Sequence, residues 1–286
     1  MWIQISSRIR RLALCKPAYL LIPILFLFAA CTTIPGEMSD PDVLRAQAEL
    51  ALDEGDLPTA LVKLRRAYSE DGDNIETLRL MARFYATSNS TTEQRQVLQQ
   101  LLTVDPSNAY GLEQLGLLEL QAGQLNQADN YFKFALVIDS QRWMALNGLG
   151  VIADNQIRYA EAAAYFLKAL AIVPGHPKLL ANLGWSKLLA GDLPEAESRL
   201  QESLQAEPDS ITTRSNLAFS IALQGRYQEA LQLYETLYSE PVAANNVGYA
   251  ALSRGDSAAA RRYFDTAVKN SPSFYRKAVN NRSSVK

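Results

Sequence analysis

Glycine recurs at a fixed spacing through most of this chain. Counting from Gly191 in steps of about 34 residues, a length typical of helical repeats, reaches further glycines at Gly55, Gly123 and Gly225. Asn89 and Ile157 occupy the two remaining positions of the series. A constant period of this length predicts a tandem array of short helical units. Each unit buries its apolar face only by stacking on its neighbours, so the array forms one continuous core.

The residues between these glycines repeat as well. Leu183-Gly184 is followed by Ala196, then by Leu200 and finally by Pro208, and Ala196 lies midway between Gly184 and the proline. This order resembles the tetratricopeptide repeat (TPR), in which paired helices meet through small residues and a large apolar side chain fills the gap to the next pair. The resemblance implies an all-α TPR α-solenoid of about seven helix pairs over residues 41–274, with a capping segment at 275–286.

The period changes once, near the C-terminal end. Gly255 follows Gly225 about one helical turn too early for the period, and Pro241 lies between them. Because proline cannot continue a helix interior, we expect the second helix of the sixth pair to be about one turn shorter than the others.

The N-terminal segment has a different composition. Residues 8–16 are basic, residues 18–28 are apolar, and Ala29-Ala30 precede Cys31. The order is typical of a secretory signal peptide over residues 1–30; an uncleaved membrane anchor is the alternative, although the apolar run is short for a membrane span.

The sequence Phe28-Ala29-Ala30-Cys31 resembles the bacterial lipobox, which implies that Cys31 is acylated and anchors the chain to a membrane. Thr32 stands where aspartate would favour inner-membrane retention, so the resemblance implies an outer-membrane lipoprotein facing the periplasm. Residues 31–40 would then be the acylated cysteine and a short tether.

Composition excludes several classes of function. The chain has 28 basic and 30 acidic residues, and without residues 1–30 the net charge is −6, which gives no electrostatic basis for binding nucleic acid. The two cysteines, Cys15 and Cys31, lie outside the repeats, and His176 is the only histidine. No spacing suggests a metal site, no glycine-rich phosphate loop is present, and we expect neither a cofactor nor enzymatic activity.

A ligand groove follows from the resemblance to TPR proteins. In that family the first helix of each pair lines a concave face with repeat positions 2, 5, 9, 12 and 13. Position 9 carries an aromatic residue in the last three pairs and position 12 carries two leucines, which predicts a partner-binding groove at Trp185, Phe219, Tyr249, Leu188 and Leu252. Aromatic anchors suit a peptide or helical ligand. Packing of these rings against neighbouring helices is the alternative.

Two further sets of residues fall on the same helices. Asn182, Asn216 and Asn246 share position 6; we include them among the groove candidates and interpret them chiefly as structural hydrogen-bonding residues. The first two pairs carry mixed charge, which is either solvated or a small basic patch around the arginines: Asp42, Arg45, Glu49, Glu76, Arg79 and Arg83.

A lipobox followed by tandem repeats resembles the TadD-like lipoproteins of tight-adherence (Flp) pilus assembly. The local similarity lies in Asn245-Asn246-Val247-Gly248-Tyr249 and in Ser271-Pro272-Ser273-Phe274-Tyr275. The resemblance implies a scaffold that binds protein partners such as the pilus secretin. The alternative function is a TPR adaptor lipoprotein that docks peptidoglycan hydrolases or other envelope proteins.

Overall fold

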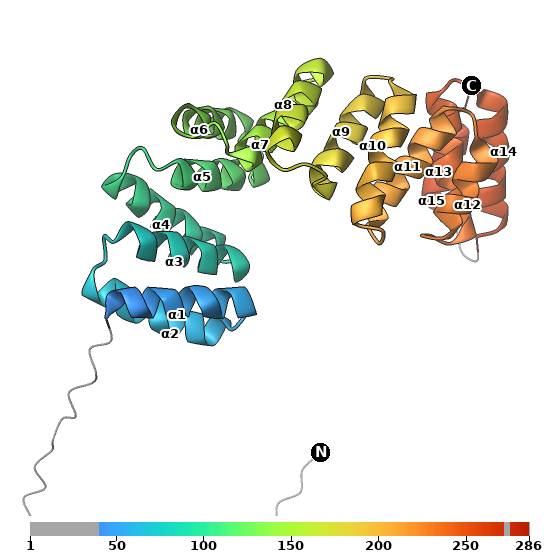
Figure 1. Cartoon of the computed structure of the whole chain (residues 1–286). Helices are drawn as coiled ribbons and strands as arrows, with labels where there is room; N and C mark the ends of the chain where they lie inside the picture. The colour runs from blue at the N-terminus through green and yellow to red at the C-terminus, as the bar shows by residue number, and fades with distance from the viewer. Residues whose placement is uncertain (1–39, 272–274, 286) are drawn as a thin grey trace, which may run out of the picture. The chain divides into compact units, whose positions relative to one another are not determined.

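The computed structural model describes residues 40–271 and 275–285, and this part of the chain consists of helices without β-strands (Figure 1). Fourteen helices form seven antiparallel pairs, and a fifteenth follows them. The first member of each pair, here the A helix, is α1 (Pro41–Glu54), α3 (Ile75–Thr87), α5 (Ala109–Gln121), α7 (Trp143–Asn155), α9 (Pro177–Leu189), α11 (Ile211–Leu223) or α13 (Glu240–Ser253). The second member, the B helix, is α2 (Leu57–Glu70), α4 (Thr91–Val104), α6 (Leu125–Ile138), α8 (Tyr159–Ile172), α10 (Leu193–Ala206), α12 (Tyr227–Glu235) or α14 (Ser257–Lys269).

The helices follow the period of the sequence. The first six A helices begin at one constant interval, at Pro41, Ile75, Ala109, Trp143, Pro177 and Ile211. Helix α12 has 9 residues, whereas the other B helices have 13 or 14, and α13 begins at Glu240. The α-solenoid of seven helix pairs with a terminal helix, expected from the sequence, is confirmed.

The turn between the two helices of a pair uses a left-handed backbone conformation. Gly191 has a φ of +83°, in a region that favours glycine. Asn89 and Ile157, which replace the glycine in two pairs, adopt φ values of 56° and 62°. These two pairs therefore form the same turn although glycine is replaced. The left-handed conformation costs little conformational free energy for asparagine and more for a β-branched residue such as isoleucine.

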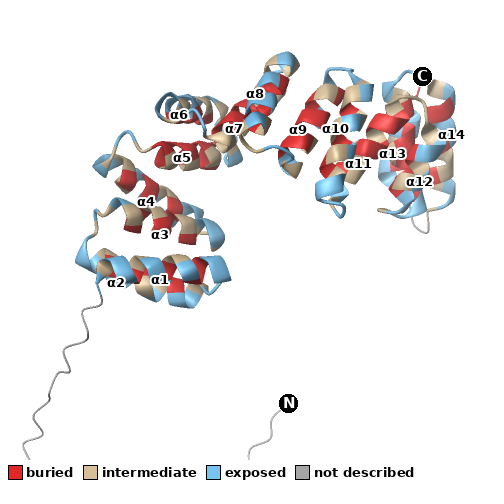
Figure 2. Cartoon of the chain, viewed as in Figure 1, coloured by how far each residue is buried: buried red, intermediate tan, exposed pale blue. Residues whose placement is uncertain are grey.

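Buried residues recur along every pair of helices (Figure 2). The core is made where small residues of one helix receive a large residue of the next. Phe132 on α6 is fully buried, and its ring lies against Gly116 of α5 and Gly148 of α7. A methyl group added at Gly116 would lie 2.6 Å from the ring, and one added at Gly148 would overlap it. One aromatic side chain thus closes two helix contacts, one within its own pair and one with the following pair.

Helix α15 (Arg276–Ser283) covers the end of the last pair. Ala278 packs with Ala244 of α13 and Ala267 of α14. The Asn281 amide also donates a hydrogen bond of 2.9 Å to the side-chain oxygen of Asn245, which is 1% exposed. The terminal helix therefore shields both apolar and polar groups of α13.

Several sequence predictions lie outside the described residues: the signal peptide at 1–30, acylated Cys31, the tether up to residue 39, and the segment 272–274. Within the part that the structure describes, no helix combines the length and apolar character needed to cross a bilayer.

Candidate protein-binding face

The predicted aromatic residues lie on three neighbouring A helices. Trp185 is on α9, Phe219 on α11 and Tyr249 on α13, and α11 contacts both α9 and α13. The rings of Phe219 and Tyr249 stack, with centroids 6.1 Å apart and planes inclined by 21°. The Tyr249 side chain is 53% exposed and that of Trp185 is 36% exposed, whereas Phe219 is half-buried against the core. The structure thus leaves two of the three rings accessible to a partner and uses the third to support one of them.

Trp185 also forms one wall of a pocket between α7 and α9. The pocket has a volume of about 410 Å³ and is lined by Val151, Asp154, Asn155, Phe166, Asn182, Trp185 and Leu189. Burial raises the pKa of the Asp154 carboxyl, and a hydrogen bond from Ser186 Oγ to Asp154 Oδ1, 2.7 Å long, opposes that rise. The walls can hold an apolar side chain, while the carboxylate and two amides can pair with polar groups of the same ligand.

Sequence reasoning did not assign Asp154 and Asn155 to this face. They occupy positions 12 and 13 of the pair that begins at Trp143, and both positions belong to the set that lines the groove in TPR proteins. The repeat register contained the signal, but the sequence prediction named groove residues only in the first two and the last three pairs.

The two leucines predicted at position 12 are less accessible. Leu188 is 5% exposed and belongs to the core, so the structure places it beneath the surface. Leu252 is half-buried and packs against the C-terminal core cluster. The lining of this face therefore depends on the rings and the amides more than on the leucines.

Of the three asparagines at position 6, Asn182 connects neighbouring pairs. Asn182 donates a hydrogen bond of 2.8 Å to the side-chain oxygen of Asn147 on α7, which fits the interpretation as a structural residue. Asn216 and Asn246 are half-buried, and in the last pair it is Asn245, one residue earlier, that forms the bond to α15.

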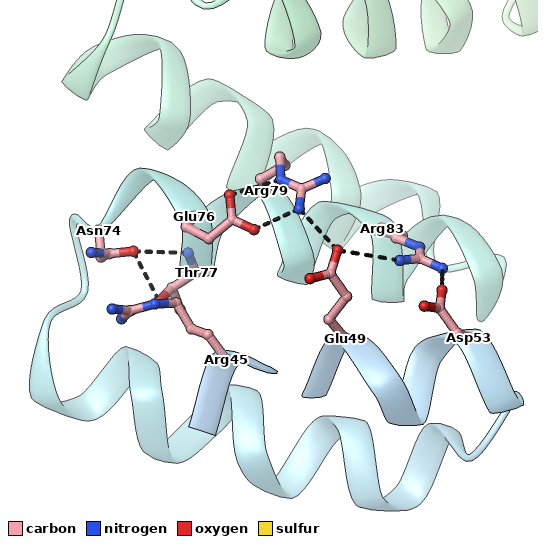
Figure 3. Close-up of polar contacts among 8 residues, drawn as sticks. All are labelled: Arg45, Glu49, Asp53, Asn74, Glu76, Thr77, Arg79 and Arg83. Carbon is pink, nitrogen blue, oxygen red and sulfur yellow. Dashed lines mark hydrogen bonds and ion pairs between the residues drawn. The ribbon is translucent and has the colours of Figure 1, made fainter. Parts of the chain in front are cut away.

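The charged residues of the first two pairs form a neutralised network (Figure 3). Arg79 contacts Glu76 at 2.5 Å and Glu49 at 3.2 Å, and Arg83 pairs with Glu49 and Asp53. Arg45 reaches Asp42 and the Thr77 hydroxyl. With three arginines among four carboxylates, these residues form a charge-paired surface, and the basic patch that the sequence left open is not formed.

No group of three or more histidine, cysteine or acidic side chains is arranged to hold a metal ion in the described ranges. His176 immediately precedes α9, its side chain makes no capping hydrogen bond to the helix, and its ring packs against Trp143 at a centroid distance of 4.6 Å. The single histidine thus has a packing role.

Comparison with known protein families agrees with this architecture. Models described as tetratricopeptide repeat match residues 51–115 and 156–218, residues 113–177, and residues 210–237. Together they span the chain from residue 51 to residue 237.

Several known repeat proteins are similar to this chain in sequence or in structure. A TPR repeat-containing protein of Pseudomonas aeruginosa is 32% identical over 177 residues, which is 61% of this chain and 30% of that relative. The type IV pilus assembly protein PilF of the same organism is 25% identical over 153 residues, 53% of this chain and 61% of PilF. The crystal structure of PilW, a type IV pilus biogenesis factor, superposes with a TM-score of 0.54 at 18% identity, covering 84% of this chain and 97% of PilW, which shows a shared fold. The match spans less than a third of the first relative's length, so it identifies repeats and no whole-protein activity.

Proposed function

The chain belongs to the tetratricopeptide repeat family, and on that premise we propose that it is a non-enzymatic scaffold that binds partner proteins during pilus assembly in the bacterial envelope. The observation that carries the proposal is the accessible aromatic surface of the A helices, formed by Trp185 and by Tyr249 stacked on Phe219. Exposed rings on a rigid scaffold are anchors for a peptide or helix, because they bury a large apolar area at small entropic cost.

The pilus role is supported by two kinds of similarity. PilF, one of the relatives, is a type IV pilus assembly protein. The sequence of this chain also resembles the TadD-like family of the Flp pilus. We propose accordingly that the partner is a segment of a pilus secretin or of another envelope assembly protein.

Anchoring to the membrane is the second part of the proposal. The lipobox-like sequence ending at Cys31 supports an acylated N-terminus, and Thr32 supports the outer membrane with the repeats in the periplasm. Stable attachment needs more than one acyl chain, which a lipoprotein cysteine would carry.

Partner binding is tested with the acylated protein extracted in mild detergent and its copurifying proteins. We expect a secretin or other pilus components, and we expect Trp185→Ala with Phe219→Ala to abolish their recovery while the far-ultraviolet circular dichroism stays unchanged. Val62→Ala, on α2, is the control and should leave recovery intact, because this side chain is 66% exposed and lies on a B helix outside the aromatic surface. Recovery of wall hydrolases would favour the adaptor function instead, and a destabilised double variant that still binds would show the rings to be core.

Anchoring is tested separately with Cys31→Ala. We expect the protein to leave the membrane fraction or to remain as an uncleaved precursor. A mature-length variant that stays in the membrane would contradict the lipoprotein assignment.

A further inference from the structure

Helix α6 is apolar on two sides. Toward the core it buries Ala128, Phe132 and Ala135, as a B helix of this fold must. Toward solvent it carries Phe134, Val137 and Ile138, whose side chains are 62%, 83% and 46% exposed. Packing within the array accounts for the first set only. Contiguous exposed apolar side chains of this kind mark interaction sites on soluble proteins.

Two hollows border this apolar ridge. On one side, a hollow of about 510 Å³ is lined by uncharged residues that include Leu112, Tyr131, Phe134 and Ile138. On the other, a hollow of about 640 Å³ lies between α6 and α8, where Leu136, Val137 and Ile172 contribute apolar walls. We call the ridge and its two hollows the α6 surface. Its volumes are large enough to receive apolar side chains of a partner.

The charge of the α6 surface has one sign. Lys133 and Lys168 line the larger hollow, and no carboxylate lines either hollow. Lys133 pairs with Asp129 at 2.7 Å, and the nearby Asp139 is paired with Arg142 at 3.1 Å. Lys168 lies 5.8 Å from the centroid of the Tyr165 ring and has no carboxylate within ion-pair distance in the described part of the chain. On an otherwise acidic array, this hollow therefore offers unneutralised positive charge beside apolar walls.

We propose that the α6 surface is a second docking site, which binds a partner helix with one apolar face and a row of carboxylates along one edge. The ridge of α6 would interdigitate with the apolar face, as ridges and grooves do between packed helices. The carboxylates would lie over Lys168, whose charge is unpaired among the described residues, and beside Lys133, which also contacts Asp129, and this charge complementarity fixes the orientation of the helix. This site centres on the B helices α6 and α8 and shares no residue with the aromatic surface of α9, α11 and α13.

The probe is a fluorescently labelled synthetic helix of about 18 residues, long enough to be partly helical in solution. It carries leucine at positions i, i+3, i+4 and i+7 and glutamate along one edge; a second peptide has lysine in place of every glutamate. Fluorescence anisotropy with the repeat array should show the glutamate peptide binding about tenfold or more tightly than the lysine peptide, as expected for close charge pairs at an interface.

Three variants locate the binding. Val137→Glu should lower the affinity for the glutamate peptide by about tenfold or more, because it places a negative charge at the centre of the apolar ridge. Val62→Glu on α2, where the valine is 66% exposed, is the matched control and should have no effect. The double variant Lys133→Glu with Lys168→Glu should reverse the preference between the two peptides, so that the lysine peptide binds more tightly than the glutamate peptide. Unchanged circular dichroism and thermal midpoint establish that each variant is folded.

Two outcomes would overturn the proposal. The first is equal affinity for both peptides, or binding that survives Val137→Glu. The second is self-association: if sedimentation equilibrium shows a dimer of the unmodified chain that Val137→Glu converts to a monomer, the α6 surface is an interface between copies of this chain.

Discussion

Single residues of the turns show how strictly the fold imposes its backbone. Ile157 occupies the position that glycine holds in most pairs, and its φ of 62° lies in the left-handed region. This conformation costs a β-branched residue about 1–2 kcal/mol of conformational free energy, because its Cβ lies too close to the following carbonyl oxygen. Its side chain is 73% exposed, so no packing compensates. The strain is imposed by the helices on either side.

We therefore expect Ile157→Gly to stabilise the array by about 0.5–1 kcal/mol, since relief of the strain exceeds the greater flexibility of glycine in the unfolded chain. Urea denaturation of both proteins measures the change. Asn89→Gly is the control: asparagine tolerates the same conformation, so its gain should be smaller. Equal gains at both positions would mean that the β-branched side chain is not the cause.

Contacts between helices also depend on single residues. Phe132 is fully buried between Gly116 and Gly148, and a Cβ at residue 148 would overlap its ring. We expect Gly148→Ala to destabilise the array by about 1–3 kcal/mol, the usual cost of overpacking a core. Gly72→Ala is the control, because a Cβ there would meet its nearest neighbour at an ordinary 3.5 Å. Similar unfolding midpoints for the two variants would contradict the packing role.

At the scale of the element, one helix start depends on a neighbouring pair. Helix α7 is preceded by Arg142, whose side chain cannot accept a hydrogen bond from the amides of the first helical turn. Glu113 of α5 takes that role: its Oε1 accepts from the Ala145 amide at 3.2 Å, and its Oε2 lies 3.4 Å from Arg142. The carboxylate is fully buried. An acidic group thus caps a helix of the next pair and couples the two.

The titration of Glu113 should therefore affect stability. Burial raises the pKa of this carboxyl above its ordinary value, although Arg142 and the Ala145 amide oppose the rise. Because the folded chain then holds the proton more tightly than the unfolded chain, this residue's contribution to the free energy of unfolding is greatest below the unfolded pKa and declines as pH rises through the folded pKa. In Glu113→Gln that decline is absent, so the variant should gain stability relative to the unmodified chain as pH rises from about 4 to 7. Urea denaturation across this pH range measures the difference, and a difference independent of pH would contradict the assignment.

The sequence predicts the elements better than it predicts these connections. The constant period predicts where the helices lie, and Pro241 with the early Gly255 predicts that α12 is short. Both features could be predicted because helix and turn formation depend on local residues. The cap by Glu113 joins residues 32 positions apart, and its only sequence signal is a glutamate within an apolar helix that precedes an uncapped one. The sequence did not predict the α6 surface. The repeat pattern assigns Ala128, Phe132 and Ala135 to the core, but it gives no role to the other apolar side chains of α6.

At the scale of the whole molecule, the described repeats form a chain of local contacts. Each A helix packs on its own B helix and on helices of adjacent pairs, and the principal contacts in residues 40–271 and 275–285 do not reach further. In such an array, stability is close to a sum of the stabilities of the pairs and of the interfaces between neighbours. Damage in one pair should therefore spread only to the pairs beside it.

This locality can be measured by native-state hydrogen exchange. We expect Gly148→Ala to lower amide protection in α5–α8 by about tenfold or more, while protection in α13–α15 changes little. A uniform loss of protection across all helices would show that the array unfolds as one cooperative unit.

The position of Phe132 between two glycines also bears on how this chain can evolve. In the three later pairs the position equivalent to Gly148 is asparagine, at Asn182, Asn216 and Asn246. Repeat arrays gain and lose whole units by recombination between similar segments of a gene, and deletion of the pair α7–α8 would bring Asn182 to the place of Gly148. The asparagine Cβ would then meet the Phe132 ring in its present position, so the ring would have to shift. The junction of α8 and α9 shows that this combination packs, because Phe166 holds the position equivalent to Phe132 there, is fully buried and lines one pocket together with Asn182. A loss of the pair α7–α8 should therefore require the shift of one buried ring at the new junction and leave the rest of the core unchanged.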